Sequence, residues 1–211
     1  MDDLNSIVYL VDDDRRILTA LTRLLESDGR VTQAFTSARA FLEAHDPEVP
    51  GCVVLDLLMP EMSGLALQHE LQRLGRCRPV IFLSGRAGVP ACASAMKAGA
   101  VDFLTKPVEA ELFLATIARA VARDAAEREH AGKRRALSDR MTSLTLRERQ
   151  VLEGVVEGLL NKQIANRLGI VEKTVKVHRA HAISKLGARS TAELVRMVYS
   201  LNPEGSAART S

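Results

Sequence analysis

Polar side chains follow the apolar runs in the first half of the sequence, and their types suit phosphoryl chemistry. They are Asp12 and Asp13 after residues 7–11, Asp56 after 52–55, Ser84 after 80–83, and Lys106 just past 101–104. Gathered carboxylates repel one another unless a hard cation lies between them, and Mg²⁺ prefers a few carboxylates with water. An ammonium and a hydroxyl beside the metal would neutralise the charge that spreads during phosphoryl transfer. One carboxylate remains as a nucleophile, since aspartates form acyl phosphates.

Five apolar runs must bring these side chains together. The runs are residues 7–11, 31–35, 52–55, 80–83 and 101–104, and segments with apolar residues at helical spacing separate them. Strands that alternate with helices predict an α/β fold with a doubly wound, five-stranded parallel sheet. Ligands bind such sheets at the carboxyl ends of the strands, which is the edge where all five polar side chains are expected.

Each of these aspartates also has a structural explanation when it is taken alone. Aspartate often caps a helix or closes a turn, with no part in chemistry. Fitting residues at successive strand ends favour a shared site over separate caps.

The rest of the chain is predicted to be helical. Residues 123–141 are strongly charged and lack a wide apolar stripe, so we interpret them as a helical linker with Gly132 as its break. A small all-α domain of four helices is expected from residue 142 to 205. Thr145 and Glu148 fit a capping box at its first helix, and Asn161 can cap the second. A third helix is expected from 172 to 186, and a fourth after Ser190.

The third of these helices is predicted to have an apolar inner face and a basic outer face. A short helix, a turn and such a helix form a helix-turn-helix motif, whose second helix enters the major groove of DNA. Lys176 is placed to reach a guanine edge and Val177 to touch a thymine methyl group. Phosphate contacts are expected from Lys162, Lys173 and Arg179, and Thr174 and Ala180 share the predicted DNA-binding surface. The alternative is an ordinary solvated helix face.

Composition agrees with a DNA-binding second half. The net charge is −4 over residues 1–120 and +5 over residues 139–201, and a basic compact domain suggests a polyanionic partner. Aromatic residues make up 3% of the chain, too few for the stacking platforms that bind single strands. No apolar run is long enough to span a membrane and the first residues are acidic, so we expect a cytoplasmic protein. The cysteines Cys52, Cys77 and Cys92 show no C-x-x-C spacing and indicate reduced thiols.

The first half resembles the receiver domain of two-component response regulators, the CheY-like fold. The segments "LVDDD", "VVLDLLMPEMSG", "FLSGR" and "GAVDFLTKP" carry the resemblance, from about residue 6 to 120. It implies that Asp56 is the phosphoacceptor and that Asp13, Asp56 and the backbone carbonyl of Leu58 ligate Mg²⁺ or Mn²⁺, with Asp12 acting through water. It further implies that Lys106 and Ser84 bind the phosphoryl group and that Phe103 is the switch aromatic. Two residues depart from common relatives: Ser84 replaces Thr, and Arg86 replaces His.

The second half resembles the LuxR-type DNA-binding domain of the FixJ/NarL group. The segment "LTLRERQVLEGVVEGLLNKQIANRLGIVEKTVKVHRAHAISKLGARSTAELV" carries that resemblance. Relatives commonly have Ser where Val171 stands, so the third helix is expected to lack its side-chain cap, at a cost of about 0.5–2 kcal/mol. Some relatives have a base-contacting Lys where Ala180 stands, so the DNA sequence that is bound does not carry over.

These features predict a response regulator with a receiver at 1–122, a linker at 123–141 and a DNA-binding domain at 142–205. A sensor histidine kinase would phosphorylate it, after which a homodimer would bind double-stranded promoter DNA, with RNA polymerase as a further candidate partner. We expect no turnover enzyme. One alternative is a phosphatase of the haloacid dehalogenase type, but Leu58 stands where those enzymes have a second Asp. Another is a transcription factor that works without phosphorylation and has a degenerate receiver.

Overall fold

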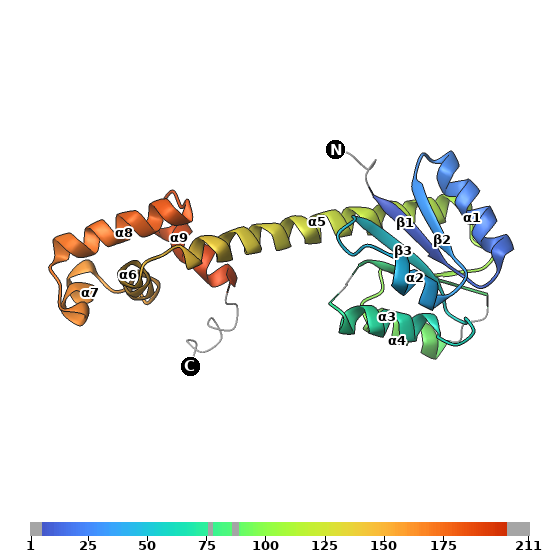
Figure 1. The fold of residues 1–211 in the computed structure, drawn as a ribbon, viewed down its shortest axis with the longest axis horizontal. Helices are drawn as coiled ribbons and strands as arrows, with labels where there is room; N and C mark the ends of the chain where they lie inside the picture. The colour runs from blue at the N-terminus through green and yellow to red at the C-terminus, as the bar shows by residue number, and fades with distance from the viewer. Residues whose placement is uncertain (1–5, 76–77, 86–88, 202–211) are drawn as a thin grey trace. The chain divides into compact units, whose positions relative to one another are not determined.

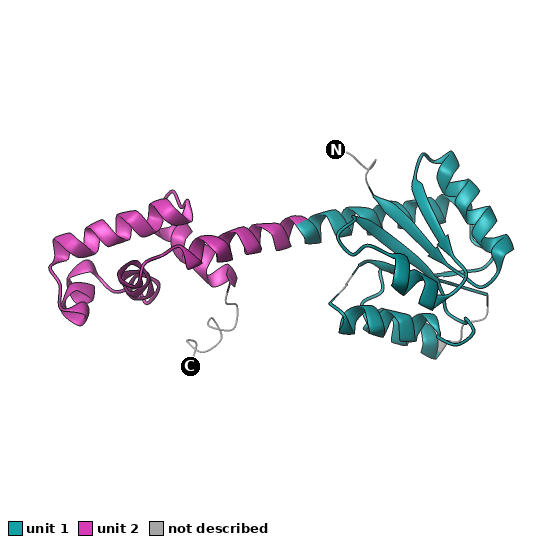
Figure 2. Ribbon diagram, in the orientation of Figure 1, with its two compact units in different colours: residues 1–128 teal, residues 129–211 magenta. Residues whose placement is uncertain are grey.

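The computed structural model of the 211-residue chain describes residues 6–75, 78–85 and 89–201. Its contacts divide the chain into two compact units, Met1–Arg128 and Glu129–Ser211 (Figure 2). Cys77 and Arg86, which the sequence analysis singled out, lie outside the described residues.

The first unit is built on a five-stranded parallel sheet with strand order β2-β1-β3-β4-β5. Figure 1 shows this sheet with β1, β2 and β3 labelled. Its strands are β1 (Ile7–Val11), β2 (Val31–Phe35), β3 (Gly51–Asp56), β4 (Val80–Ser84) and β5 (Asp102–Thr105). The predicted fold and all five strands are confirmed, the first two with the predicted bounds. The third is longer than predicted at both ends, so that Asp56 is its last residue.

Helices pack on both faces of the sheet and bury its alternating side chains in two separate cores. The helices are α1 (Arg15–Ser27), α2 (Ala38–Ala44), α3 (Gly64–Arg73), α4 (Val89–Lys97) and α5 (Ala110–Thr142). One core joins Val54 and Leu83 to α1 and α5, and the other joins Val53 and Phe82 to α2, α3 and α4. Successive strand residues point to opposite faces, so β1, β3, β4 and β5 each contribute to both cores, whereas the edge strand β2 adds only Phe35 to the second.

Helix α5 continues through Gly132, where the sequence analysis expected a break. A single glycine inside a helix costs only about 1 kcal/mol relative to alanine. Neighbouring charged residues add favourable pairs at i,i+4 spacing, such as Lys133 Nζ with Glu129 Oε1 at 2.5 Å. The prediction of a break at Gly132 was therefore wrong, and the division between the two units falls inside α5, after Arg128.

The second unit contains α6 (Leu146–Val156), α7 (Asn161–Leu168), α8 (Glu172–Leu186) and α9 (Thr191–Leu201), with the end of α5. The capping box at α6 is confirmed: the Glu148 backbone N–H donates to Thr145 Oγ1, and the Thr145 N–H donates to Glu148 Oε2. Asn161 does not cap α7. Leu160 is the N-cap residue instead, and its backbone N–H donates to Gln163 Oε1 at 2.7 Å.

Glu148 joins this cap to α8. Its carboxylate is buried and accepts from Lys185 Nζ at 2.6 Å. The hydrogen bond from Lys185, together with that from the Thr145 backbone, lowers the pKa of Glu148 to about 2. The start of α6 and the end of α8 are thus tied by one ionised side chain.

No helix in the described part of the chain is long and apolar enough to cross a membrane. Cys52 and Cys92 are free thiols. Burial in the sheet raises the pKa of Cys52 to about 12, so this thiol stays protonated and serves as a core residue.

Candidate functional site

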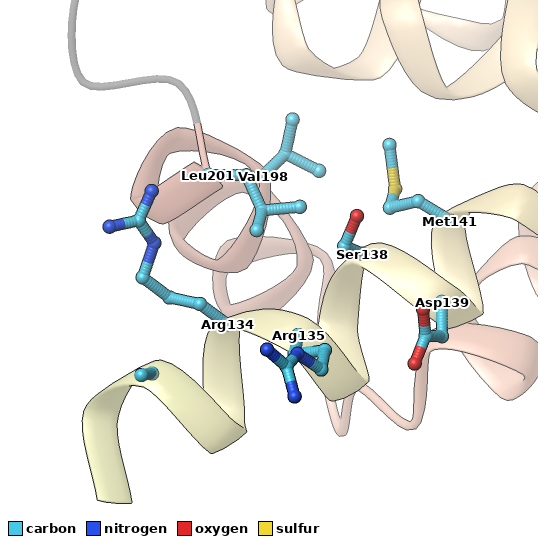
Figure 3. Close-up of a pocket in the computed structure, with 8 residues that line it drawn as sticks. Arg134, Arg135, Ser138, Asp139, Met141, Val198 and Leu201 are labelled. Atoms are coloured by element: carbon cyan, nitrogen blue, oxygen red, sulfur yellow. The ribbon is translucent and has the colours of Figure 1, made fainter. Parts of the chain in front are cut away.

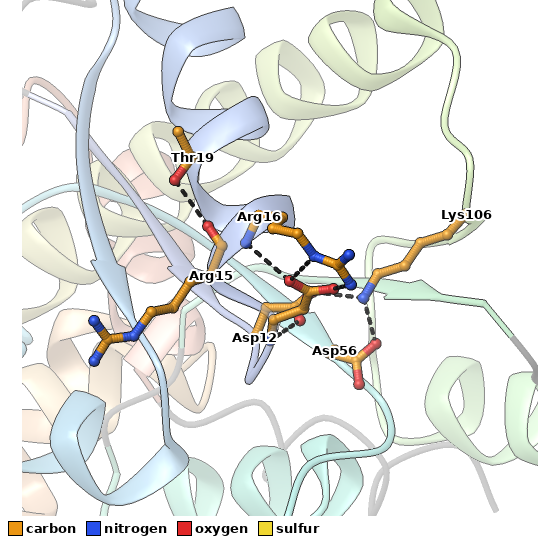
Figure 4. A network of polar contacts seen from close by, with 7 residues as sticks. Asp12, Arg15, Arg16, Thr19, Asp56 and Lys106 are labelled. Atoms are coloured by element: carbon orange, nitrogen blue, oxygen red, sulfur yellow. Dashed lines mark hydrogen bonds and ion pairs between the residues drawn. The ribbon is translucent and has the colours of Figure 1, made fainter.

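Two buried carboxylates and one ammonium meet at the carboxyl edge of the sheet (Figure 4). Lys106 Nζ donates to Asp12 Oδ2 at 2.5 Å and to Asp56 Oδ1 at 2.8 Å. The side chains of Asp12 and Asp56 are only 5% and 8% exposed, so these ion pairs are screened little by water. Three of the five predicted residues are therefore in direct contact.

Backbone groups hold each member of this cluster in place. Asp12 directly follows β1, and Asp56 is the last residue of the neighbouring strand β3. Each accepts a backbone N–H from two residues further on, Asp14 at 2.9 Å and Leu58 at 2.9 Å. The Lys106 backbone N–H donates to the Ser84 carbonyl at 2.9 Å, which joins the ends of β4 and β5. The sheet register thus fixes the site.

Burial and pairing shift the protonation of the cluster in known directions. Desolvation raises the pKa of Asp12, although the hydrogen bond from Lys106 opposes this. Desolvation also disfavours the Lys106 ammonium, but the hydrogen bonds to Asp12 and Asp56 outweigh it and raise the pKa of Lys106. Lys106 therefore remains charged at neutral pH and serves as the counter-ion of both carboxylates.

The other predicted residues lie around this cluster without joining it. Asp13 is exposed, and the Leu58 side chain is 61% exposed, as expected of a residue that would offer only its backbone. Ser84 is buried at the end of β4. Phe103 is half-buried on β5, and its ring lies 6.1 Å from that of Phe82, with 24° between the ring planes. The placement of Phe103 fits a core residue as well as a switch.

The donor set fits a hard divalent cation. Among the described residues, no three His, Cys, Asp or Glu side chains converge closely enough to enclose an ion, so the predicted gathering of Asp12, Asp13 and Asp56 is not seen. Asp12 and Asp56 meet at the Lys106 ammonium, whereas Asp13 is exposed. Carboxylate and carbonyl oxygens are nevertheless the ligands that Mg²⁺ prefers.

One residue of this region was missed from the sequence. Gly64 begins α3, and a side chain there would press against the Asp56 carbonyl oxygen and lie 2.9 Å from Cε1 of Phe82. Its backbone N–H donates to the Leu57 carbonyl at 3.0 Å. Only glycine permits this approach, and the signal in the sequence was the glycine that follows Ser63 before a helical pattern.

The predicted DNA-binding residues lie on α8 and at the start of α7. On α8, Lys173, Lys176, Val177 and Ala180 are exposed, and Val175, Ala182 and Leu186 are buried, which agrees with the predicted apolar inner face and basic outer face. Lys162 is exposed on α7, and Thr174 is half-buried. Val171 is the N-cap residue of α8 and provides no side-chain hydrogen bond, as expected.

Arg179 differs from the other basic residues of α8. Its Nη1 donates to Asn161 Oδ1 at 2.9 Å, and its Nη2 donates to Thr191 Oγ1 at 2.8 Å. Asn161 and Thr191 are the first residues of α7 and α9, so one guanidinium links three helices. This also explains why Asn161 does not cap α7: its side-chain oxygen is used by Arg179.

A hollow of about 520 Å³ lies between α5 and α9 in the second unit (Figure 3). Arg134, Arg135, Ser138, Asp139 and Met141 line it from α5, and Val198 and Leu201 line it from α9. None of the predicted site residues lies there, so the hollow adds nothing to either site.

Comparisons with known proteins assign each half of the chain to a known family of domains. The profile of the response regulator receiver domain matches residues 8–118, and that of the bacterial regulatory proteins of the luxR family matches residues 142–198. The response regulator protein TmoT of Ectopseudomonas mendocina is 43% identical over 201 residues, which cover 95% of this chain and 91% of TmoT. The transcriptional regulatory protein FixJ of Azorhizobium caulinodans is 43% identical over 190 residues, 90% of each chain.

Solved structures extend this likeness to the fold. The structure of the response regulator StyR has a TM-score of 0.82 and 42% identity, over 92% of this chain and 98% of StyR. A receiver-type α/β unit followed by a helix-turn-helix unit defines the class of transcriptional response regulators. This chain belongs to the two-component response regulator family and, within it, to the members with a LuxR-type DNA-binding domain such as FixJ. Both resemblances drawn from the sequence are confirmed. The receiver implies a sensor kinase partner, and the LuxR-type domain implies DNA binding.

Proposed function

We propose that Asp56 is the nucleophile that accepts a phosphoryl group from a sensor histidine kinase. The observation that carries this proposal is the Lys106 ammonium bound to both Asp12 and Asp56 at the carboxyl edge of the sheet. An Asp56 carboxylate oxygen attacks phosphorus, the bond from phosphorus to the donor histidine breaks, and its electron pair returns to the imidazole. Lys106 then pairs with the new phosphoryl oxygens, and the Ser84 hydroxyl donates to one of them.

We propose that Asp13, Asp56 and the Leu58 backbone carbonyl hold Mg²⁺, or Mn²⁺ in its place, and that Asp12 acts through water. When bound, the cation supplies positive charge beside the transferred phosphoryl oxygens. Three residues of the chain act on the same group. Lys106 neutralises the charge of the phosphoryl oxygens, and the Ser84 hydroxyl donates a hydrogen bond to one of them. The Leu58 backbone N–H orients the Asp56 carboxylate through its 2.9 Å hydrogen bond. Phe103 would turn inward when Ser84 moves toward the phosphate.

Acetyl phosphate as donor tests the nucleophile directly. With Mg²⁺ present, the mass of the intact wild-type chain should rise by one phosphoryl group, and Asp56→Asn should gain none because the amide is not nucleophilic. Ser84→Ala is the matched control, since it keeps the carboxylate and should slow the reaction without preventing it. If the Asp56→Asn chain still gained the mass of a phosphoryl group, another residue would be the acceptor and the proposal would be wrong.

The exposed face of α8 is proposed to read the major groove. Lys176 contacts a guanine edge and Val177 a thymine methyl, beside Thr174 and Ala180. Lys162, Lys173 and Arg179 were predicted to bind phosphates, and the first two have the exposure that this requires. For Arg179, phosphate contact would require it to release the bonds to Asn161 and Thr191.

We further propose a cytoplasmic protein without a turnover activity, whose phosphorylation drives a homodimer onto two promoter half-sites. RNA polymerase is the candidate partner at the promoter. The domain limits that we propose are 1–122, 123–141 and 142–205, with the linker inside the continuous helix α5. Size-exclusion chromatography with light scattering, with and without acetyl phosphate, tests the dimer.

A further inference from the structure

The two helices of the helix-turn-helix motif begin differently from other helices of the chain. At α1, α2, α3 and α6, a side-chain oxygen of the N-cap residue accepts a backbone N–H from the first turn. These N-cap residues are Asp14, Ser37, Ser63 and Thr145. Ser190 precedes α9 and accepts a backbone N–H in the same way, at 3.1 Å. Helices α7 and α8 begin after Leu160 and Val171, and neither residue provides a side-chain hydrogen bond.

Both of these N-cap residues carry apolar side chains that are open to solvent. Leu160 is 70% exposed and Val171 is 67% exposed, and among the large apolar residues that the structure describes only Leu146 is more exposed. A serine at either position would cap its helix and expose no branched apolar group. Residues that break a local rule with no compensating contact inside the fold are expected at functional sites. The compensation is therefore expected from a contact outside the chain.

Val171 lies at the N-terminal end of the recognition helix α8. Its backbone is extended, with φ −82° and ψ 150°, and its carbonyl accepts from the Thr174 N–H at 2.9 Å. The first residues of a recognition helix are those that reach base edges in the major groove. Exposed Lys173 is two residues away, so Val171 is continuous with the proposed DNA-binding face.

Leu160 has a different place against α8. Its neighbour Asn161 accepts from Arg179 Nη1 at 2.9 Å, so α7 begins beside the middle of α8. Arg179 follows Val171 by about 12 Å along the helix axis, at a rise of about 1.5 Å per residue. Leu160 therefore lies away from the N-terminal end of α8, and it offers a comparison for Val171.

The chemistry of the major groove limits what an apolar residue there can contact. Base edges present nitrogen and oxygen donors and acceptors, and the apolar group among them is the C5-methyl of thymine. A valine side chain has no polar atom, so it would only desolvate a phosphate or a guanine edge. The adjacent Glu172 carboxylate, which pairs with Lys176 Nζ at 3.3 Å, also disfavours a phosphate at this end of the helix.

We propose that Val171 contacts a thymine methyl group and is a further specificity-determining residue of the DNA-binding unit. The apolar N-cap gives up helix stability, and burial of its methyl groups against thymine offsets this loss in the complex with DNA. The inference rests on the proposed DNA recognition and deepens it, because it names one more base of the half-site. That base is a thymine, in addition to the thymine assigned to Val177.

Selection from random double-stranded DNA tests this contact, with the full chain treated with acetyl phosphate and Mg²⁺. The wild type should enrich one sequence, and Val171→Ser should lose the preference for thymine at one position while it keeps the others. Leu160→Ser is the matched control, because it makes the same kind of change at the other apolar N-cap and should keep every preference. Both variants should unfold at a higher temperature than the wild type, since serine caps a helix.

Deoxyuridine then removes the methyl group of that thymine and nothing else. The exchange should weaken binding of the wild type and of Leu160→Ser about fourfold for each half-site, because one buried methyl contact is lost, and should not change binding of Val171→Ser. The inference is wrong if Val171→Ser relaxes no thymine position, if the wild type binds both bases equally there, or if Val171→Ser shows the same fourfold loss. A wild-type chain that enriches no sequence would overturn the proposed DNA recognition itself, and this inference with it.

Discussion

Arg179 offers a sharp test of how the DNA-binding unit works, because its two possible roles predict opposite results. Its guanidinium joins Asn161 and Thr191, at 2.9 and 2.8 Å, and so links α7 and α9 to α8. Hydrogen bonds from a charged donor contribute about 1.5–3 kcal/mol each, less where water screens them. For the half-buried Arg179 we expect Arg179→Ala to lose about 2 kcal/mol in all, which lowers the Tm of this unit by roughly 8–16 °C.

Calorimetry of the full chain measures this loss, and DNA affinity at several salt concentrations measures phosphate contacts. Each phosphate contact contributes about 0.9 to the slope of log K against log salt. Lys173→Ala is the control: it should lower that slope by about 0.9 for each DNA-bound copy and leave Tm unchanged. Arg179→Ala should do the reverse, with Tm lowered and slope kept. An Arg179→Ala chain with a normal Tm and a reduced slope would refute the structural role of Arg179 in linking the helices and would support its contact with a DNA phosphate.

Three further predictions follow from the geometry. Lys106→Met should bind Mg²⁺ more tightly than the wild type in isothermal titration calorimetry, because the ammonium that competes for Asp12 and Asp56 is gone. The same variant should accept a phosphoryl group more slowly. Weaker Mg²⁺ binding would contradict this prediction. Gly64→Ala should destabilise the receiver by about 1–3 kcal/mol through its clash with Asp56 and Phe82, whereas Gly132→Ala, in open space on α5, should stabilise by about 1 kcal/mol; equal effects in thermal unfolding would refute the close approach. The Glu148 carboxylate should stabilise the second unit fully above its ordinary pKa of 4.5, and this contribution should be lost as the pH falls toward about 2. The reason is that the pKa of Glu148 is lower in the folded state than in the unfolded state. Glu148→Gln should lack this pH dependence.

The sequence predicted the sheet well because β1, β3 and β4 are buried apolar runs of strand length, separated by longer segments with helical spacing. It predicted that Asp12, Asp56 and Lys106 would meet at the carboxyl edge, but it also expected Asp13 and Ser84 there, and these two do not join the contact. It did not predict that Lys106 would lie between Asp12 and Asp56, because the position of a long side chain depends on charges far away in the sequence. The predictions for Gly132 and Asn161 failed for a related reason, because they used only local residue preferences. Ion pairs between side chains of α5 support the helix around Gly132, and the Asn161 side chain binds Arg179, which is distant in the sequence.

Because Lys106 lies between Asp12 and Asp56, the stability of the receiver fold and its ability to be phosphorylated can depend on different cations. Lys106 gives the acidic edge a counter-ion from within the chain, so under the proposed function a chelator should leave the receiver folded while it stops the phosphorylation of Asp56. Under that proposal, free magnesium sets the fraction of copies that can be phosphorylated, and a shortage of the ion stops phosphorylation without unfolding the chain and exposing it to proteases.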